Sequence, residues 1–131
     1  MRGDDALMFV DETLKKFKIR DSVKVIYAGK VTSGYSMYKA LCYGADVCNS
    51  ARGFMFSLGC IQSLRCHTDS CPTGIATQNK NLQVGLVPEV KYKRVQNYHK
   101  NTIESLLEIL AVTGINDIKK LDKSMVHKYN Y

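Results

Sequence analysis

The chain has 131 residues, of which 45% are hydrophobic and 24% are charged. These values are typical of an ordinary globular domain and exclude the disordered, collagenous and disulfide-packed classes. A chain of this length can bury one modest core. No internal repeat, low-complexity tract or linker interrupts the sequence, so it predicts a single structural unit.

The formal net charge of +7 would permit binding to nucleic acid or to an anionic surface. The basic residues are spread along the chain without an aromatic-interleaved patch, which favours a solvated basic surface and no nucleic-acid partner. Examples of these dispersed residues are Lys15, Lys24, Lys80, Lys91, Lys119 and Lys128.

No apolar stretch approaches the ~20 residues of a membrane helix, because Asp11, Lys39 and Glu108 interrupt the best candidates. Met1 is followed by Arg2-Gly3-Asp4-Asp5, which is not the pattern of a secretory signal. We therefore expect a cytoplasmic protein. In that reducing compartment, the five cysteines are expected to be metal ligands, redox groups or buried thiols rather than a disulfide framework.

The first predicted element is an amphipathic helix over Ala6 to Phe17, with Asp4 or Asp5 as its cap. Lysines near its end suit the negative pole of the helix dipole. Its apolar face is predicted to consist of Leu7, Val10, Leu14 and Phe17.

A strand, a helix and a second strand are predicted next. Val23 to Tyr27 is short and β-branched and indicates a buried strand that ends in a tight loop. Gly34 to Tyr43 indicates a helix that Gly44 ends, and Ala45 to Ser50 is the second strand candidate. Strand, helix and strand in about thirty residues are typical of a parallel sheet covered by helices, so the fold class is α/β.

The second half begins with a short apolar turn or helix over Phe54 to Gly59 and an irregular segment from Cys60 to about Gln83. Pro88 opens a long helix that Gly114 closes, and a further short helix is predicted over Ile118 to Met125. Lys128 to Tyr131 is predicted to fray. One face of the long helix is expected to carry Val95, Tyr98, Ile103, Leu106, Leu107 and Leu110.

Three cysteines lie within twelve residues as Cys60-x5-Cys66-x4-Cys71, and Pro72 follows the last. Close thiolates favour an iron-sulfur cluster or zinc, and a Cys-Pro step also closes ferredoxin-type cysteine runs. Zinc would use His67 as a fourth ligand, although its adjacency to Cys66 is awkward for tetrahedral coordination. On spacing alone, a cluster, zinc and unligated thiols all remain open. Cys42 and Cys48 fall on a predicted helix and strand, where cysteines behave as small hydrophobes.

Two short loops follow the predicted strands at the same edge of the sheet. The first contains Gly29 and Lys30, and the second contains Ala51 and Arg52. In a barrel, the last two such loops commonly bind phosphate through backbone N–H groups, and the two cationic side chains would add positive charge. The pair of loops is stronger evidence for a phosphate site than either one alone, because a glycine after a strand usually marks only a turn.

These segments together resemble the FMN-binding synthase domain of the glutamate synthase family, over about residues 6 to 114. The residues that carry the resemblance are Val25-Ile26-Tyr27-Ala28-Gly29-Lys30-Val31, Ala45-Asp46-Val47-Cys48-Asn49-Ser50-Ala51-Arg52-Gly53-Phe54-Met55, Leu58-Gly59-Cys60-Ile61-Gln62, Cys66-His67-Thr68-Asp69-Ser70-Cys71-Pro72-Thr73-Gly74-Ile75-Ala76-Thr77-Gln78 and Asn101-Thr102.

The resemblance implies a (β/α)8 TIM barrel that holds FMN beside a 3Fe-4S cluster. Such a flavoprotein oxidoreductase, acting on CH-NH2 donors in glutamate biosynthesis, reduces the imine formed from 2-oxoglutarate and glutamine-derived ammonia. It implies that Cys60, Cys66 and Cys71 ligate the cluster, and that Gly29, Lys30, Ala51 and Arg52 bind the FMN phosphate. The predicted strands would be the seventh and eighth of the barrel, and the long helix would close it.

The chain lacks the first six strands, so we expect one partial domain over 1–131, equivalent to about the last two β/α units, that is inactive alone. A polypeptide with the other strands, or self-association, would then cover its open sheet edge. The alternatives are a non-catalytic iron-sulfur electron-transfer or metal-binding module and a remnant without cofactor.

Overall fold

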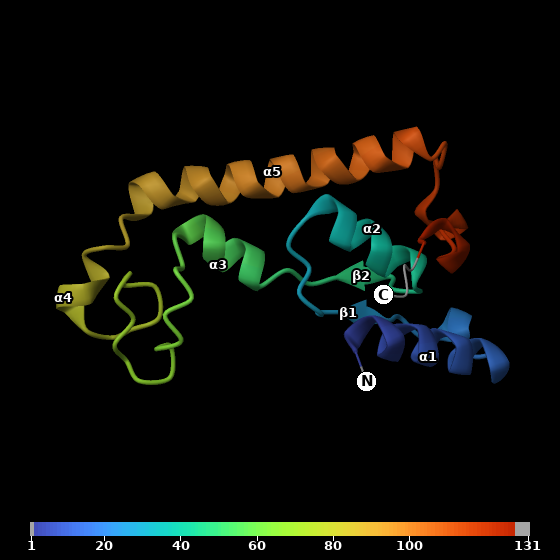
Figure 1. The fold of residues 1–131 in the computed structure, drawn as a ribbon, viewed down its shortest axis with the longest axis horizontal. Helices are drawn as coiled ribbons and strands as arrows, with labels where there is room; N and C mark the ends of the chain where they lie inside the picture. The colour runs from blue at the N-terminus through green and yellow to red at the C-terminus, as the bar shows by residue number, and fades with distance from the viewer. Residues whose placement is uncertain (1, 128–131) are drawn as a thin grey trace. The chain divides into compact units, whose positions relative to one another are not determined.

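The structure is a computed structural model that describes residues 2–127, and it contains helices and a short parallel sheet (Figure 1). The helices and strands, in chain order, are α1 (Gly3–Lys16), β1 (Ile26–Tyr27), α2 (Gly34–Cys42), β2 (Val47–Cys48), α3 (Arg52–Leu58), α4 (Lys80–Gln83) and α5 (Pro88–Val112). Single 3-10 turns lie at η1 (Arg20–Ser22), η2 (Ile118–Lys120) and η3 (Lys123–Met125). Lys128 to Tyr131, which we predicted to fray, lie outside the described residues.

The described chain forms two units, which we treat separately. Unit 1 comprises residues 2–50 and 102–127, and unit 2 comprises residues 51–101. Unit 1 contains the sheet with α1 and α2, whereas unit 2 contains the three-cysteine segment with α3 and α4.

The two strands of unit 1 pair in parallel, with Ile26 opposite Val47 and Tyr27 opposite Cys48. Helix α2 connects them, so the predicted strand-helix-strand unit is confirmed, and this arrangement is compatible with the predicted α/β class. The strands are shorter than predicted. The burial of the first strand was also predicted wrongly, because Ile26 is 61% exposed; Val47 on the second strand is 47% exposed. Register partners project from the same face of a sheet, so the two side chains form an exposed apolar pair.

Helix α2 begins with a capping box and packs against α5. The Ser33 side chain accepts a hydrogen bond from the Ser36 backbone N–H, and the Ser36 hydroxyl lies 2.9 Å from the Ser33 backbone nitrogen. A β-carbon on Gly34 would lie 2.6 Å from the Leu106 backbone nitrogen, so only glycine allows this close approach. The core of unit 1 forms around this contact, from Leu7, Tyr38, Ala40, Cys42, Tyr43, Ala45, Leu106 and Leu110.

Helix α1 begins one turn earlier than predicted, at Gly3, and its N-cap Arg2 makes no side-chain cap bond. The predicted aspartate cap is therefore wrong. Asp4 lies in the first turn and instead accepts hydrogen bonds from Tyr27 Oη and Lys39 Nζ, each at 2.8 Å. The Asp4 carboxylate thus binds residues of β1 and α2, although the sequence pattern had predicted a capping role for an aspartate at this position.

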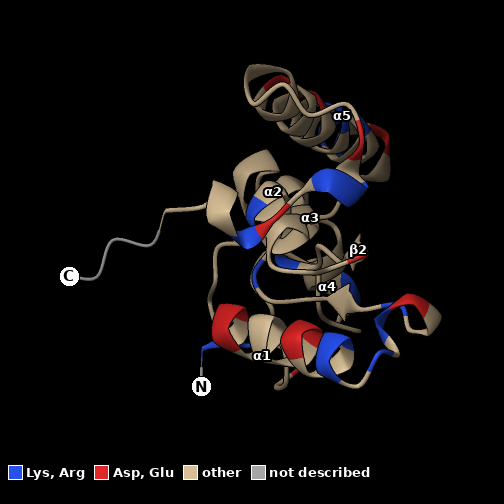
Figure 2. Cartoon of the chain, turned by 90° about the vertical axis from the view of Figure 1, so that its right-hand side faces the viewer, with Lys and Arg blue, Asp and Glu red and all other residues tan. Residues whose placement is uncertain are grey.

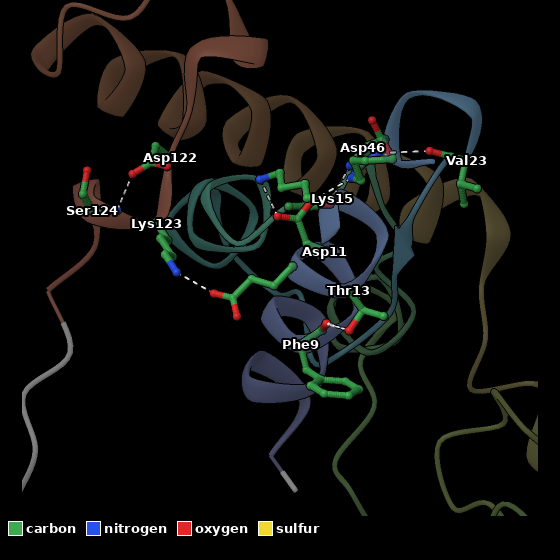
Figure 3. Close-up of polar contacts among 12 residues, drawn as sticks. Phe9, Asp11, Thr13, Lys15, Val23, Asp46, Asp122, Lys123 and Ser124 are labelled. Carbon is green, nitrogen blue, oxygen red and sulfur yellow. Dashed lines mark hydrogen bonds and ion pairs between the residues drawn. The ribbon is translucent and has the colours of Figure 1, made fainter. Parts of the chain in front are cut away.

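The predicted apolar face of α1 is only partly buried. Leu7 is buried in the core, whereas Val10 is 42% exposed and Phe17 is 67% exposed. Phe9 is also 61% exposed, and Figure 3 shows its ring projecting from the helix. The helical spacing identified the apolar residues correctly, but unit 1 covers only the part of that face around Leu7.

Arg20 joins α1 to the start of the sheet through a network of charged groups. Its Nε donates to Asp11 Oδ1 at 2.7 Å, and its Nη2 lies 2.9 Å from Asp46 Oδ2. Asp11 is 6% exposed and also pairs with Lys15 at 2.6 Å (Figure 3). Asp46 accepts the backbone N–H of Val25 at 2.8 Å. The network holds the segments that lead into both strands.

Helix α5 starts at Pro88 and ends at Val112, before Gly114 with a left-handed φ of +71°, as predicted. Of its predicted apolar face, Leu106 and Leu110 are buried but Leu107 is 57% exposed. The single helix predicted over Ile118 to Met125 is wrong. Two 3-10 turns occupy this segment because Leu121 is extended and Asp122 caps the second turn by accepting the Ser124 N–H at 2.8 Å.

Unit 2 brings α3 against the first part of α5. The Phe54 ring contacts the Tyr98 ring edge-on at 5.1 Å between centroids and stacks on His99 at 6.0 Å. Gly59 ends α3 with φ +107°, in agreement with the predicted short apolar helix. Helix α4 lies inside the segment predicted to be irregular and is capped by the Asn79 side chain. Among residues 2–127, no helix is both long and apolar enough to cross a membrane.

Candidate functional site

The loop after β1 and the end of the loop after β2 meet in unit 1. The Ser50 hydroxyl donates to the Val31 carbonyl at 2.6 Å, and the Asn49 N–H donates to the Tyr27 carbonyl at 2.8 Å. Gly29 and Lys30 lie within this arrangement, and both are exposed. Lys30 adopts a left-handed φ of +57°, so the chain turns sharply at the end of the first strand.

The other two predicted phosphate residues open unit 2. Ala51 is the N-cap of α3 and Arg52 is its first residue, and both are exposed. All four predicted residues therefore follow the carboxyl ends of two parallel strands, within a few residues of the strand end.

A polar network under the first loop was not anticipated from the sequence. A β-carbon on Gly29 would lie 2.2 Å from Tyr27 Oη, which is held in place by its hydrogen bond to Asp4. Burial and the hydrogen bond to Asp4 raise the pKa of Tyr27 to about 12. Burial alone would raise the pKa of Asp4, but hydrogen bonds from Lys39 and Tyr27 outweigh it and lower that pKa. Gly29 is thus required by a fixed tyrosine beneath it.

The three cysteines of the Cys60-x5-Cys66-x4-Cys71 segment all lie in unit 2 as free thiols. Cys60 is half-buried, Cys66 is exposed and Cys71 is buried. Within residues 2–127, no three His, Cys, Asp or Glu side chains are gathered closely enough to hold a metal ion. The structure places the three thiols on one segment without bringing their sulfur atoms together, and His67 is exposed.

Cys71 has the environment of a thiolate. Its sulfur lies 3.3 Å from the Thr73 hydroxyl. Hydrogen bonds from that hydroxyl and from the backbone N–H groups of Ala76 and Thr73 lower the pKa of Cys71 to about 7. Since the thiolate is the form that binds metals, this site is prepared for ligation near neutral pH. Three thiols on one segment, one with a stabilised thiolate, fit the donor chemistry of an iron-sulfur cluster.

The segment after Cys66 is held by a compact set of hydrogen bonds. The buried Thr77 hydroxyl donates to the Asp69 carbonyl at 2.6 Å, and Gln83 Nε2 donates to the Thr77 carbonyl at 2.9 Å. Asp69 has a left-handed φ of +55° and its carboxylate accepts the Gln78 N–H. The sequence predicted an irregular segment here, because these contacts join residues six to nine positions apart and follow neither a helical nor a strand period.

The remaining two cysteines belong to unit 1 and have different surroundings. Cys42 is buried in the core and Cys48 is half-buried on β2. Burial raises the pKa of both thiols, which keeps them protonated. Both placements agree with the prediction that these cysteines act as small hydrophobes.

A hollow lies in unit 1, between α1 and residues 121–123 near the end of the described chain. It has a volume of ≈ 220 Å³ and is lined by charged residues of both elements, including Asp11, Lys15 and Asp122. Its cations already have partners, because Lys15 pairs with Asp11 and Lys123 pairs with Glu12 (Figure 3). Figure 2 shows the same mixture of acidic and basic positions along α1. Because both lysines of this hollow are already paired with carboxylates, the hollow gives no indication of a ligand site.

Comparison with known proteins adds the family. Residues 4–116 match the family model described as a conserved region in glutamate synthase. The chain is 44% identical over 111 residues to the glutamate synthase large subunit-like protein YerD of Bacillus subtilis, which covers 85% of this chain and 21% of that protein. It is 35% identical over 116 residues to the archaeal glutamate synthase [NADPH] of Methanocaldococcus jannaschii, covering 88% of this chain and 23% of that protein.

A more distant match, 29% identical over 110 residues, is the glutamate synthase [NADPH] large chain of Bacillus subtilis, of which 7% is covered. The chain thus spans less than a quarter of the length of these relatives. The match contains both strand-end loops and all three cysteines of the unit 2 segment. On the strength of the model match and of these identities, the chain belongs to the glutamate synthase family, within its conserved region.

Proposed function

We propose that this chain is the C-terminal part of a glutamate synthase FMN-binding barrel. In the completed enzyme it would contribute to reductive amination of 2-oxoglutarate to glutamate. The observation that carries the proposal is the parallel β1-α2-β2 unit followed by a three-cysteine segment, inside the region that matches the family. That order is the one expected of the last two β/α units of a (β/α)8 barrel with an iron-sulfur loop behind them.

Cys60, Cys66 and Cys71 are the proposed ligands of a 3Fe-4S cluster, which would supply one-electron transfer. The low pKa of Cys71 supports this role, because its thiolate is present near neutral pH. The Asp69 and Thr77 contacts support it further, since they hold the chain on both sides of Cys71. Cys60 and Cys66 then complete the ligand set when the cluster binds.

Gly29, Lys30, Ala51 and Arg52 are the proposed contacts of the FMN phosphate. Their position after the carboxyl ends of parallel strands supports the proposal, because phosphate sites of such barrels form there. Lys30 and Arg52 are exposed cations at these two strand ends. Their part in the reaction is to bind and orient the flavin, and the remaining contacts to flavin and 2-oxoglutarate come from the strands that this chain lacks.

The partner we propose is a polypeptide that carries the other strands of the barrel. Ile26 and Val47 form an exposed apolar pair on the sheet, and Phe9 and Phe17 are exposed on and just after α1. The matched segment makes up only 21% and 23% of two relatives, so a polypeptide with the remaining barrel units is the partner that fits this exposed apolar surface. The chain alone is accordingly inactive.

The cluster assignment is tested by anaerobic purification, iron and sulfide analysis, and electron paramagnetic spectra. We expect iron and sulfide in the ratio of a 3Fe-4S cluster. Zinc in place of iron, or no metal, would refute it. Cys66→Ser should abolish the cluster while far-ultraviolet circular dichroism shows that the helices persist, and Cys48→Ser is the matched control that should keep the cluster. A cluster that survives Cys66→Ser means that Cys66 is no ligand.

The partner assignment is tested by producing the chain together with a relative's preceding synthase segment. Co-purification, FMN absorbance and glutamate formation from 2-oxoglutarate are the expected results. Ile26→Lys should weaken co-purification, because it places a charge on the apolar pair, whereas Lys24→Glu on the exposed approach to the strand should not. Equal recovery of both variants would contradict the proposed docking face.

A further inference from the structure

Two cations of α5 lie against the glycine that precedes the first cysteine of the segment. A β-carbon on Gly59 would lie 3.1 Å from Lys91 Nζ and 3.9 Å from Arg94 Nη1. Gly59 also has a φ of +107°, which residues other than glycine rarely adopt. Both cationic groups therefore lie beside the backbone of the residue that precedes Cys60.

The distance from these cations to Cys60 has an upper bound that follows from backbone geometry. A β-carbon lies about 1.5 Å from its Cα, and consecutive Cα atoms are about 3.8 Å apart. Adding the distances from Gly59 places both charged groups within roughly 9 Å of the Cys60 Cα. That is no more than the screening length of about 10 Å in 0.1 M salt, so each charge acts on groups bonded to Cys60.

The charges of unit 2 do not neutralise these cations. Residues 51–101 contain seven Lys and Arg against two Asp and Glu, which gives this unit +5 of the +7 net charge of the chain. Neither Lys91 nor Arg94 has a carboxylate within ion-pair distance among the residues that the structure describes. Three thiolates gathered near Cys60 would therefore experience a net positive electrostatic potential.

We propose that Lys91 and Arg94 raise the reduction potential of the iron-sulfur cluster held by Cys60, Cys66 and Cys71. The inference rests on the proposed function, because it takes the cluster as given. Reduction adds one electron, and so one negative charge, to a group that three thiolates already make anionic. Cations within roughly 9 Å of the Cα of one proposed ligand, Cys60, stabilise the reduced form more than the oxidised form, and net charge is one of the factors that set cluster potentials.

The test is a potentiometric titration of the anaerobically prepared protein, with dithionite as the electron donor and the electron paramagnetic signal as the readout. Lys91→Gln and Arg94→Gln should each weaken the preference for the reduced cluster by roughly threefold to tenfold, where tenfold corresponds to ~59 mV for one electron. The midpoint potential of each variant should fall. The size of this shift should decrease in high salt, because the screening length of electrostatic interactions becomes shorter.

Lys93→Gln is the matched control. It removes the same charge from the same helix, but Lys93 is exposed and lies 200° around the helix from Lys91 at 100° per residue. Its potential should stay close to that of the unaltered protein.

Three outcomes distinguish this inference about Lys91 and Arg94 from the proposal that the cysteines bind an iron-sulfur cluster. Lower potentials in both variants at unchanged iron and sulfide content support it. Unchanged potentials in both variants, or an equal shift in Lys93→Gln, overturn it while leaving the cluster in place. Absence of iron and sulfide from the unaltered protein overturns the proposed function and this inference together.

Discussion

Replacing Arg20 by methionine tests the network that positions both strands. Methionine keeps most of the apolar body of the side chain but removes its donors to Asp11 at 2.7 Å, to Asp46 at 2.9 Å and to the Gly44 carbonyl at 2.9 Å. The side chains involved are mostly buried. The exposed fraction is 17% for Arg20, 9% for Asp11 and 25% for Asp46.

The magnitude follows from what remains after the substitution. Removing one partner of a fully buried pair costs ~3–5 kcal/mol, because the other charge stays buried and unpaired. Asp11 keeps Lys15 at 2.6 Å, and Asp46 keeps the Val25 N–H at 2.8 Å. We therefore expect Arg20→Met to lower the free energy of unfolding by ~2–3 kcal/mol.

The assay is urea denaturation at pH 7, followed by far-ultraviolet circular dichroism. Lys24→Met is the control, because Lys24 is 74% exposed and lies 3.8 Å from Asp46, where an ion pair contributes at most ~1 kcal/mol. A loss below ~1 kcal/mol for Arg20→Met, or one equal to that of the control, would show that the network does not support the strands.

Three further predictions concern packing, proton binding and the cysteine segment. Gly34→Ala should destabilise the chain by ~1–3 kcal/mol in the same assay, since its β-carbon would meet the backbone of α5 at 2.6 Å. An absorbance titration should show tyrosine ionisation near pH 12, and Tyr27→Phe should reduce its amplitude by one tyrosine. Because its folded pKa is raised above the ordinary value of 10.0, its contact with Asp4 stabilises the fold below pH 10 and is lost as the pH rises through about 12. Thr77→Val removes the bond to the Asp69 carbonyl, so hydrogen exchange should accelerate around Cys71 but not in α2; unchanged exchange would contradict this role.

Local pattern predicted the elements that depend on neighbours in sequence. The helix from Pro88 to the glycine at 114, the helix that Gly44 follows and the order of the two strands all agree with the structure. Helical period, a proline at the first turn and a left-handed glycine at the end are properties of consecutive residues. The family was also within reach of the sequence, because its motifs are contiguous.

What the sequence could not determine depends on residues far apart in the chain. Asp4 or Asp5 was expected to cap α1, yet the Asp4 carboxylate accepts hydrogen bonds from Tyr27 and Lys39, which lie 23 and 35 positions further along the chain. Ile26 was expected to lie in a buried strand and Phe17 on the apolar face of a helix, yet burial requires a covering element, and residues 2–127 supply none at these positions.

The cysteine segment divides in the same way. Its three thiols and their spacing were legible from the sequence, and they already pointed to metal chemistry. Only the tertiary structure shows that hydrogen bonds lower the pKa of Cys71 and that Lys91 and Arg94, from a helix far along the chain, lie beside Gly59. Ligand type is a property of the residue, whereas its pKa and the charges around it are created by folding.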